Sequence, residues 1–423
     1  MDFGAIKNVN LQLAEEYKEA SQKAYDRYND RLYYAIKEAG YSGSHLALMF
    51  IGKEPENFNN RLTDADMKVL VKVMRNYAEL VDHIDFSNNL ITVKSMPEFA
   101  EFLSCCSNLK SLNLKYNDIG KEGGILLFKG FIRMYESTGR SYLVYLNLEG
   151  CRITTEGLIE INYMDKLYYE KRTLLEQFFM ATRSLLELNL SENDIDETGL
   201  IELFSLLLPA NINSSIKVLA IDSPYKLRFT EETAYQLSKV LKSNKKLEKL
   251  SLRKAGLTDE SIVIMLKEMQ ENSTLRVLDL SANQISYKGC EYLMEYLKSP
   301  YCVLQSLIIN NNSIGDYGIK FVIESIKSNE TLAHIDLNHN RLTNPSLKRI
   351  AEAIEESPSL ASLNLFWNDF GTDSLQAFYD IIRDEEKIFR FDFMIEPVND
   401  GLQIYYYDEE LPPNVFVTRP HYF

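Results

Sequence analysis

The chain has 423 residues and a formal net charge of −15; 45% of its residues are hydrophobic and 25% are charged. This acidic balance argues against a nucleic acid as the main partner, because binding to phosphates depends on clustered Lys and Arg. No apolar run approaches the roughly 18 residues of a membrane-spanning helix, and residues 1–10 lack a stretch typical of a signal peptide. The five scattered cysteines show no CxxC spacing, so we expect a cytosolic protein with reduced thiols.

An amphipathic helix is the first element that the pattern predicts. Its apolar side chains lie roughly along one face and are Leu13, Tyr17, Ala24, Tyr28, Leu32 and Ile36, and Gly40 ends it. We expect residues 1–51 to be an N-terminal helix and cap, because a repeat array has to shield its first interface. A helix that docks on a partner is the alternative, and the pattern leaves it open.

A repeated motif, LxxLxLxxNxL, follows a degenerate unit of which only the end, Asn60 and Leu62, matches. Clear copies start at Leu109, Leu185, Leu275, Leu304, Leu332 and Leu360, and looser copies start at Val81, Leu143, Ile216, Leu247 and Ile388. The starts at 247, 275, 304, 332, 360 and 388 are 28, 29, 28, 28 and 28 residues apart. Chance clustering of leucine does not produce so regular a period.

A helical stripe follows each motif at a fixed distance. Apolar residues recur there at i, i+3, i+4 and i+7, as in Ile262, Met265, Leu266 and Met269. Each unit is therefore predicted to be a short strand followed by a helix. The predicted fold is an α/β leucine-rich-repeat solenoid, a horseshoe with parallel strands on the concave face and helices on the convex face. We place about eleven repeats, the first degenerate, and a terminal strand in residues 52–396.

The asparagine of each motif lies where the chain leaves the strand. Its side-chain amide is expected to satisfy backbone groups of the neighbouring turns. Cys151, Pro224, Ala255 and Glu396 stand in its place in four units. We expect these four turns to be held less well, and the turn at Pro224 to be the most disturbed.

Two segments depart from the regular array. An insertion between the motifs at Leu143 and Leu185 includes residues 162–169, which fit either a bulge on a binding face or a lengthened helix. Residues 397–423 form a tail rich in aromatic residues, among them Tyr405, Tyr406 and Tyr407. We expect the tail either to fold back as a C-terminal cap or to insert into a partner.

No set of residues predicts catalysis. The glycine-rich segment 120–124 lacks the GxxxxGK[ST] pattern of a phosphate-binding loop, and neither GxSxG nor HExxH occurs. His334 and His339 share one repeat without the further ligands that a metal needs. We therefore expect no enzyme, no cofactor, no metal and no small-molecule substrate.

The side chains that alternate with the strand leucines form a polar concave wall. This wall has a basic centre at Lys249, Arg253 and Lys254. We count these three residues, together with the tail tyrosines 405–407, as candidate partner-binding residues.

An apolar patch interrupts this wall near the C-terminal end of the array. Phe366 and Trp367 stand beside Met394 and Ile395 of the next predicted strand. Because parallel strands lie about 4.8 Å apart, the four side chains can form one surface. Tryptophan is enriched in binding hot spots, so the patch is a candidate contact site. Internal coverage of the patch by the tail is the alternative.

The motifs from Leu109 to Phe370 resemble the ribonuclease-inhibitor-like leucine-rich-repeat superfamily. Relatives in it include the Ran GTPase-activating protein, tropomodulin, the repeat domains of innate immune receptors and a subunit of the ciliary dynein regulatory complex. The resemblance is specific for the fold and not for the function. A GTPase-activating role would imply a catalytic arginine after an early strand, but neither Arg140 nor Arg152 reproduces that context.

These observations predict a non-enzymatic protein–protein interaction scaffold in the cytoplasm. By analogy, the specific expectation is a structural subunit of a ciliary, axonemal or cytoskeletal assembly such as the dynein regulatory complex. We expect its partners to be other proteins within a multi-subunit assembly, with no nucleic acid and no membrane. A GTPase-activating protein of the Ran type and a cytosolic signalling adaptor are the alternatives.

Overall fold

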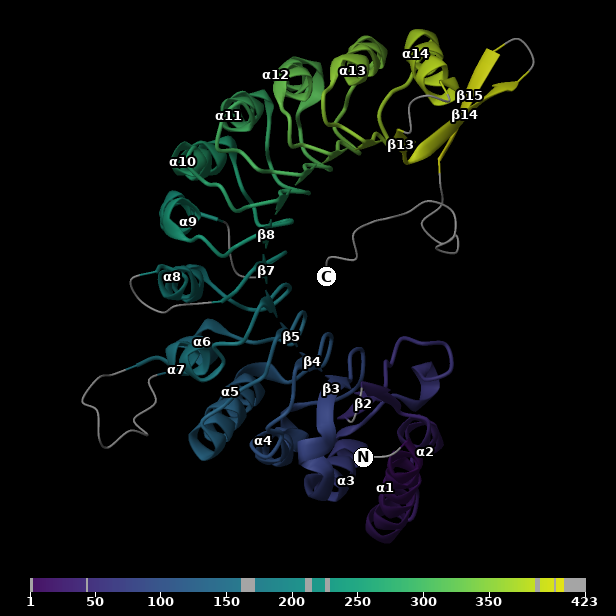
Figure 1. Ribbon diagram of the computed structural model, residues 1–423, viewed down its shortest axis with the longest axis vertical. Coiled ribbons are helices and arrows are strands. Elements are labelled where there is room, and N and C mark those ends of the chain that lie inside the picture. The colour runs from purple at the N-terminus through teal and green to yellow at the C-terminus, as the bar shows by residue number, and fades with distance from the viewer. Residues whose placement is uncertain are drawn as a thin grey trace. The chain divides into compact units, whose positions relative to one another are not determined.

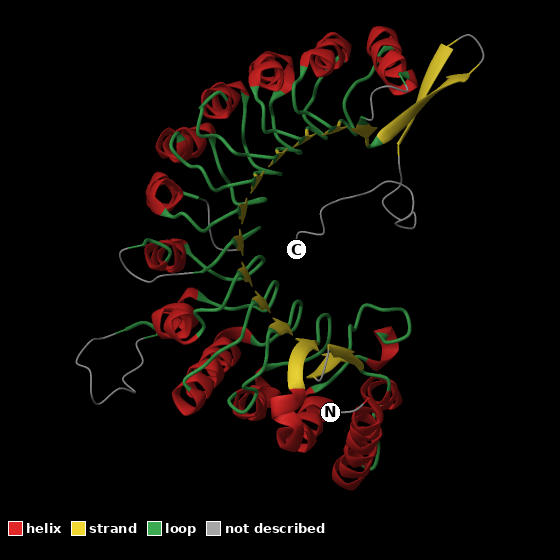
Figure 2. Cartoon of the chain, in the orientation of Figure 1, coloured by secondary structure: helices red, strands yellow, loops and turns green. Residues whose placement is uncertain are grey.

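The computed structural model describes residues 3–42, 45–160, 172–209, 215–224, 229–384, 389–398 and 401–406. The chain divides into two compact units, Met1–Leu219 with Pro224–Lys226 and Ala220–Ser223 with Leu227–Phe423. Within each unit, strands and helices alternate along the chain, and the helices lie on the outer side of a curved row of short strands (Figure 1, Figure 2). None of the helices in the described ranges is long and apolar enough to span a bilayer.

The first unit begins with two helices and then alternates. Its helices are α1 (Phe3–Tyr25), α2 (Asp30–Lys37), α3 (Asp64–Met74), α4 (Met96–Leu103), α5 (Gly120–Thr138), α6 (Thr155–Ile159), α7 (Leu174–Ala181) and α8 (Glu197–Leu206), with 3-10 turns η1 (Phe58–Asn60), η2 (Arg75–Leu80) and η3 (Val93–Ser95). Its strands are β1 (Gly40–Ser42), β2 (His45–Met49), β3 (Val81–Asp85), β4 (Ser111–Asn113), β5 (Tyr145–Asn147) and β6 (Glu187–Asn189), and β7 (Val218–Ala220) ends at the boundary.

The second unit repeats the same alternation with a more regular period. Its helices are α9 (Glu231–Ser243), α10 (Asp259–Met269), α11 (Tyr287–Leu297), α12 (Gly315–Ser328), α13 (Asn344–Glu356) and α14 (Thr372–Arg383). Its strands are β8 (Lys249–Ser251), β9 (Val277–Asp279), β10 (Ser306–Ile308), β11 (His334–Asp336), β12 (Ser362–Asn364), β13 (Arg390–Phe391), β14 (Phe393–Val398) and β15 (Gly401–Tyr406).

The strands of the array pair in parallel, with equivalent motif positions opposite one another. In the second unit Leu278 lies opposite Leu307, Leu307 opposite Ile335, and Ile335 opposite Leu363. All four side chains are buried and fill the space between the strands and the helices. The helical stripes are buried as well, as in α10, where the N-cap Thr258 hydroxyl accepts a hydrogen bond from the Ser261 backbone N–H. The predicted α/β leucine-rich-repeat solenoid is therefore confirmed.

The motif asparagines join neighbouring turns by hydrogen bonds, as predicted. The Asn283 side-chain nitrogen donates to the carbonyls of Leu252 (2.9 Å) and Leu280 (2.9 Å), and its side-chain oxygen accepts from the Leu257 N–H (3.0 Å). Asn312 makes the same hydrogen bonds one repeat later. Each buried amide thereby satisfies backbone groups of two repeats that water cannot reach.

Cys151 shows how a substituted turn is held. Its thiol donates to the Leu114 carbonyl (3.1 Å), the inter-repeat bond that an asparagine nitrogen makes elsewhere. A thiol provides no counterpart to the amide oxygen, and the backbone carbonyl of Cys151 accepts from the Gly120 N–H instead (3.0 Å). Gly120 has φ +66°, a left-handed conformation that suits glycine. The turn thus keeps one bond of the pattern and loses the other.

The N-terminal segment differs from the single predicted helix. The chain leaves α1 through Asp26, at φ +54°, and α2 begins only at Asp30. Gly40 begins strand β1, which pairs antiparallel with β2, and β2 pairs in parallel with β3. Helix α1 packs against α3, and the Tyr17 hydroxyl donates to the Asp66 carboxylate (3.4 Å). The apolar face of α1 is therefore occupied within the chain, in the capping position.

The described part of the aromatic tail folds back as a hairpin. Strands β14 and β15 pair antiparallel, and both contact α14. Phe393 is buried against the rings of Phe370 and Phe378, with centroids 5.3 and 5.5 Å away, so this end of the core is closed by aromatic contacts. Glu396 lies exposed in β14 and not in a turn of the array, which corrects its assignment as a substituted motif position.

We predict that Asn312→Leu destabilises the second unit by about 1–3 kcal/mol, because it leaves buried carbonyls and an N–H without partners. Asn340→Leu is the matched comparison, since the Asn340 side-chain oxygen accepts no hydrogen bond within the described residues. We expect Asn340→Leu to lower the free energy of unfolding by less than Asn312→Leu does. Chemical unfolding followed by circular dichroism measures both, and equal midpoints for the two variants and the unchanged protein would show that the amides do not hold the turns.

Candidate protein-binding surface

One backbone position in each turn has a left-handed conformation. In the second unit it is occupied by Ser223, Lys254, Ala282, Asn311, His339 and Trp367, with φ between +47° and +58°. Most residues avoid this region, so a non-glycine side chain there needs support from its surroundings. Backbone hydrogen bonds to the next repeat supply it at the first five of these residues: the His339 backbone N–H, for example, donates to the Phe366 carbonyl (2.9 Å). Side chains of successive repeats therefore line one edge of the unit.

Four aromatic residues meet at this edge, and we call His339, Phe366, Trp367 and Tyr406 the aromatic edge. The rings of His339 and Trp367 are stacked, with centroids 5.2 Å apart and planes at 15°. Phe366 meets Trp367 edge to face at 5.5 Å and Tyr406 at 4.6 Å. Trp367 keeps 64% of its surface exposed. An exposed tryptophan whose ring is held by two neighbouring rings offers a large rigid contact area.

The structure divides the predicted apolar patch. Phe366 and Trp367 do lie side by side, but Ile395 is buried, so its prediction as a surface contact is wrong. Ile395 lies in β14, where alternate side chains are buried, so Phe393 and Ile395 point inward together. At the equivalent position of the parallel array the chain has already left the strand. Met394 is half-buried opposite the exposed Tyr405.

Tyr406 covers one side of Phe366, which supports internal coverage for that residue and leaves Trp367 open. Tyr407 lies outside the described residues, as do residues 162–169 of the predicted insertion.

An open cavity of about 440 Å³ adjoins the aromatic edge. Its lining residues come from four successive turns and are Asn283, Asn311, Asn312, Ser313, His339, Arg341 and Trp367. Neither Arg341 nor the His339 stack was predicted to form a site. The signal that could have found them is their fixed place beside the motif asparagine, since His339 precedes Asn340 and Arg341 follows it.

One residue of the predicted basic centre, Arg253, lies beside a carboxylate. Lys249 begins β8, and the exposed Arg253 and Lys254 follow that strand. The Asp222 carboxylate accepts hydrogen bonds from the Arg253 backbone N–H (2.9 Å) and from the Ser251 hydroxyl (2.6 Å). Burial nonetheless raises the pKa of Asp222 to about 6. Arg253 therefore lies beside the acidic groups Asp222 and Asp279.

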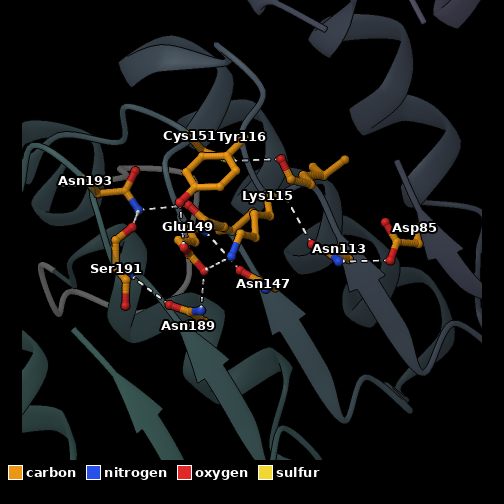
Figure 3. Close-up of polar contacts among 12 residues, drawn as sticks. Asp85, Asn113, Lys115, Tyr116, Asn147, Glu149, Cys151, Asn189, Ser191 and Asn193 are labelled. Carbon is orange, nitrogen blue, oxygen red and sulfur yellow. Dashed lines mark hydrogen bonds and ion pairs between the residues drawn. The ribbon is translucent and has the colours of Figure 1, made fainter. Parts of the chain in front are cut away.

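In the first unit, Glu149 is the centre of a polar network on the strand face (Figure 3). Its carboxylate lies 2.7 Å from the Lys115 amine and accepts from the Asn189 side chain (3.1 Å) and the Tyr116 hydroxyl (3.0 Å). Nearby, Asn113 donates to Asp85 (2.9 Å). These groups satisfy one another, so this face has a fixed polar pattern. The sequence predicts a polar concave wall but does not show which of its side chains pair.

The described residues contain no group of three or more His, Cys, Asp or Glu side chains arranged to hold a metal ion. Burial raises the pKa of the Cys151 and Cys290 thiols to about 12. Both thiols therefore stay protonated near neutral pH, and a protonated thiol is a weak nucleophile.

We predict that Asp392 makes the second unit more stable as the pH falls from about 7 to about 5. Burial raises its pKa to about 6, so the folded form binds a proton that the unfolded form releases, and this stability is lost as the pH rises through 6. Asp392→Asn removes the contribution, on the order of 1 kcal/mol. Thermal unfolding across this pH range measures it, with exposed Asp369→Asn as the control. Equal pH slopes for both variants would contradict the assignment.

Comparisons with known proteins agree with this architecture. The family described as Leucine Rich repeat matches residues 105–128, 141–161, 182–204, 271–294, 328–351 and 356–378. The chain is 26% identical to NACHT, LRR and PYD domains-containing protein 2 of Homo sapiens, over 58% of this chain and 18% of that protein. It is 24% identical to the ribonuclease inhibitor of Sus scrofa, over 66% of this chain and 62% of the inhibitor.

The chain thus spans less than a fifth of the first relative and less than two thirds of the second. Among solved structures, an internalin of Listeria monocytogenes aligns with a TM-score of 0.43 at 16% identity, over 91% of this chain and 95% of the internalin. The repeat period, the buried motif leucines and the asparagine hydrogen bonds, together with these relatives, identify the chain as a member of the ribonuclease-inhibitor-like leucine-rich-repeat superfamily, whose fold is a scaffold for protein interaction.

Proposed function

We propose that the chain is a non-enzymatic protein-binding scaffold that contacts its partner through the aromatic edge of the second unit. The observation that carries the proposal is the exposure of Trp367, the single tryptophan of the chain, whose ring lies against His339 and Phe366. Tryptophan is enriched among the residues that dominate protein interfaces, and here it lies in a group of aromatic side chains beside an open cavity.

The geometry of the edge favours tight contact at low entropic cost. The stack on His339 and the edge-to-face contact with Phe366 already restrain the Trp367 ring. A side chain that is ordered before binding loses little freedom on binding. Ribonuclease inhibitor, by its name, acts on another protein, which is consistent with protein binding by a related array.

Finer assignments rest on analogy and are proposals of the same kind. The first is a structural subunit of a cytoplasmic, ciliary or cytoskeletal multi-subunit assembly, to which Lys249, Arg253 and Lys254 could add polar contacts. The second is a GTPase-activating role, for which Arg152 is exposed but held in an ion pair with Asp118. The third is a signalling adaptor. The identity of captured proteins separates the three.

We predict that Trp367→Ala weakens partner binding at least tenfold while changing the free energy of unfolding by less than about 1 kcal/mol, because the indole is mostly exposed. Tyr116→Ala is the matched control, since Tyr116 occupies the same turn position in the first unit. Affinity capture from native extract with quantitative mass spectrometry compares the unchanged protein with both variants. Equal capture by Trp367→Ala would show that the aromatic edge is not the contact.

A truncation after Tyr406 tests the tail without removing β15, which a truncation at Pro397 would delete. Axonemal or cytoskeletal proteins among those lost from Trp367→Ala support the structural-subunit proposal. A small GTPase retained by that variant and lost from Arg152→Ala supports the activator instead.

A further inference from the structure

Two turns, one in each unit, are built alike. In both, an Ile-Gly pair opens the repeat helix, with the glycine in a left-handed conformation at Gly120 (φ +66°) and Gly315 (φ +59°). In both, the glycine N–H donates to a carbonyl of the next repeat at 3.0 Å. The residue after that carbonyl is an arginine at φ +59°, Arg152 in the first unit and Arg341 in the second.

The two turns differ in the residue that faces the arginine. Asp118 holds Arg152 in an ion pair, with its carboxylate oxygens 3.2 and 3.3 Å from one guanidinium nitrogen. At the equivalent position of the second turn stands Ser313, which has no charge. No carboxylate of the described residues forms an ion pair with Arg341, including Asp369 of the following repeat. The second arginine therefore has no ion-pair partner among the residues that the structure describes.

Arg341 lines the cavity beside the aromatic edge. Ser313 and Asn311 line the same cavity, and Trp367 with its stacked His339 forms an aromatic wall. A guanidinium presents a fork of N–H donors that matches the two oxygens of a carboxylate. The cavity thus combines a single cation, polar side chains and an apolar surface at one place.

We propose that this cavity binds the carboxylate of an Asp or Glu side chain of a partner protein, with a neighbouring apolar side chain packed on Trp367. The proposal rests on the protein-binding function proposed above. One unpaired arginine suits one carboxylate, whereas the net charge of −15 disfavours a polyanion such as a nucleic acid or an anionic membrane. Tryptophan and arginine side by side are also the residues that dominate binding hot spots.

The single tryptophan makes a direct test possible, because its fluorescence and its indole N–H resonance report on this cavity alone. The probe is the peptide N-acetyl-Phe-Asp-amide, titrated into the full chain, and its uncharged control is N-acetyl-Phe-Asn-amide. We expect the Asp peptide to bind about tenfold more tightly, since charge-assisted hydrogen bonds are roughly twice as strong as neutral ones. Added salt should reduce the difference.

Three variants test the arginine. Arg341→Asn should abolish the preference for the Asp peptide, and asparagine tolerates the left-handed backbone. Arg152→Asn is the matched control with the same φ and should keep the preference. Ser313→Asp recreates the Asp118 arrangement, pairs Arg341 internally and should also abolish the preference, without altering the arginine itself.

The outcomes separate this inference from the function on which it rests. Equal binding of the Asp and Asn peptides, with Trp367→Ala still losing the captured proteins, overturns the carboxylate site and leaves the scaffold standing. Tighter binding of N-acetyl-Phe-phosphoserine-amide than of the Asp peptide overturns the carboxylate in favour of a phosphate. A preference that survives in both Arg341→Asn and Ser313→Asp overturns the role of the arginine.

Discussion

The side-chain amide that joins each turn to the next repeat is the interaction on which the rest of the structure depends. No repeat buries its own apolar face, so leucine burial alone would allow neighbouring units to slide. The asparagine bonds oppose sliding, because the amides of Asn283 and Asn312 each satisfy carbonyls and an N–H at fixed points of two repeats. A left-handed residue directly precedes this position in each of these turns, and Trp367 occupies the equivalent place before Asn368.

What a side chain does at this edge depends on the repeat that follows it. Tyr116 lies over Gly150, where an added Cβ would come within 2.3 Å of the ring, and its hydroxyl reaches Glu149. Trp367 is followed by the β14–β15 hairpin, and its ring stacks back on His339. The same backbone position therefore produces a satisfied polar network in one unit and an exposed aromatic group in the other.

The charged side chains of this edge also depend on the neighbouring repeat. Arg152 and Arg341 occupy equivalent turns, yet within the described part of the chain only Arg152 has an ion-pair partner, because the residue at one position of the preceding repeat is Asp118 in the first turn and Ser313 in the second. A repeat array can thus keep its frame unchanged while individual side chains set the chemistry of the surface. Function in such a fold is decided by these variable positions rather than by the repeat itself.

The sequence by itself determined the repeat, the strand–helix alternation and the buried stripes, because a period of 28 or 29 residues leaves one way to bury the leucines. It also placed Phe366 and Trp367 on the surface. Only the tertiary structure decided that Ile395 is buried, that Tyr406 covers Phe366 and that Arg341 has no ion-pair partner among the described residues. The reason is that a hairpin ends the array with a different strand alternation, and that pairing across repeats joins side chains about 28 residues apart, which no local pattern reveals.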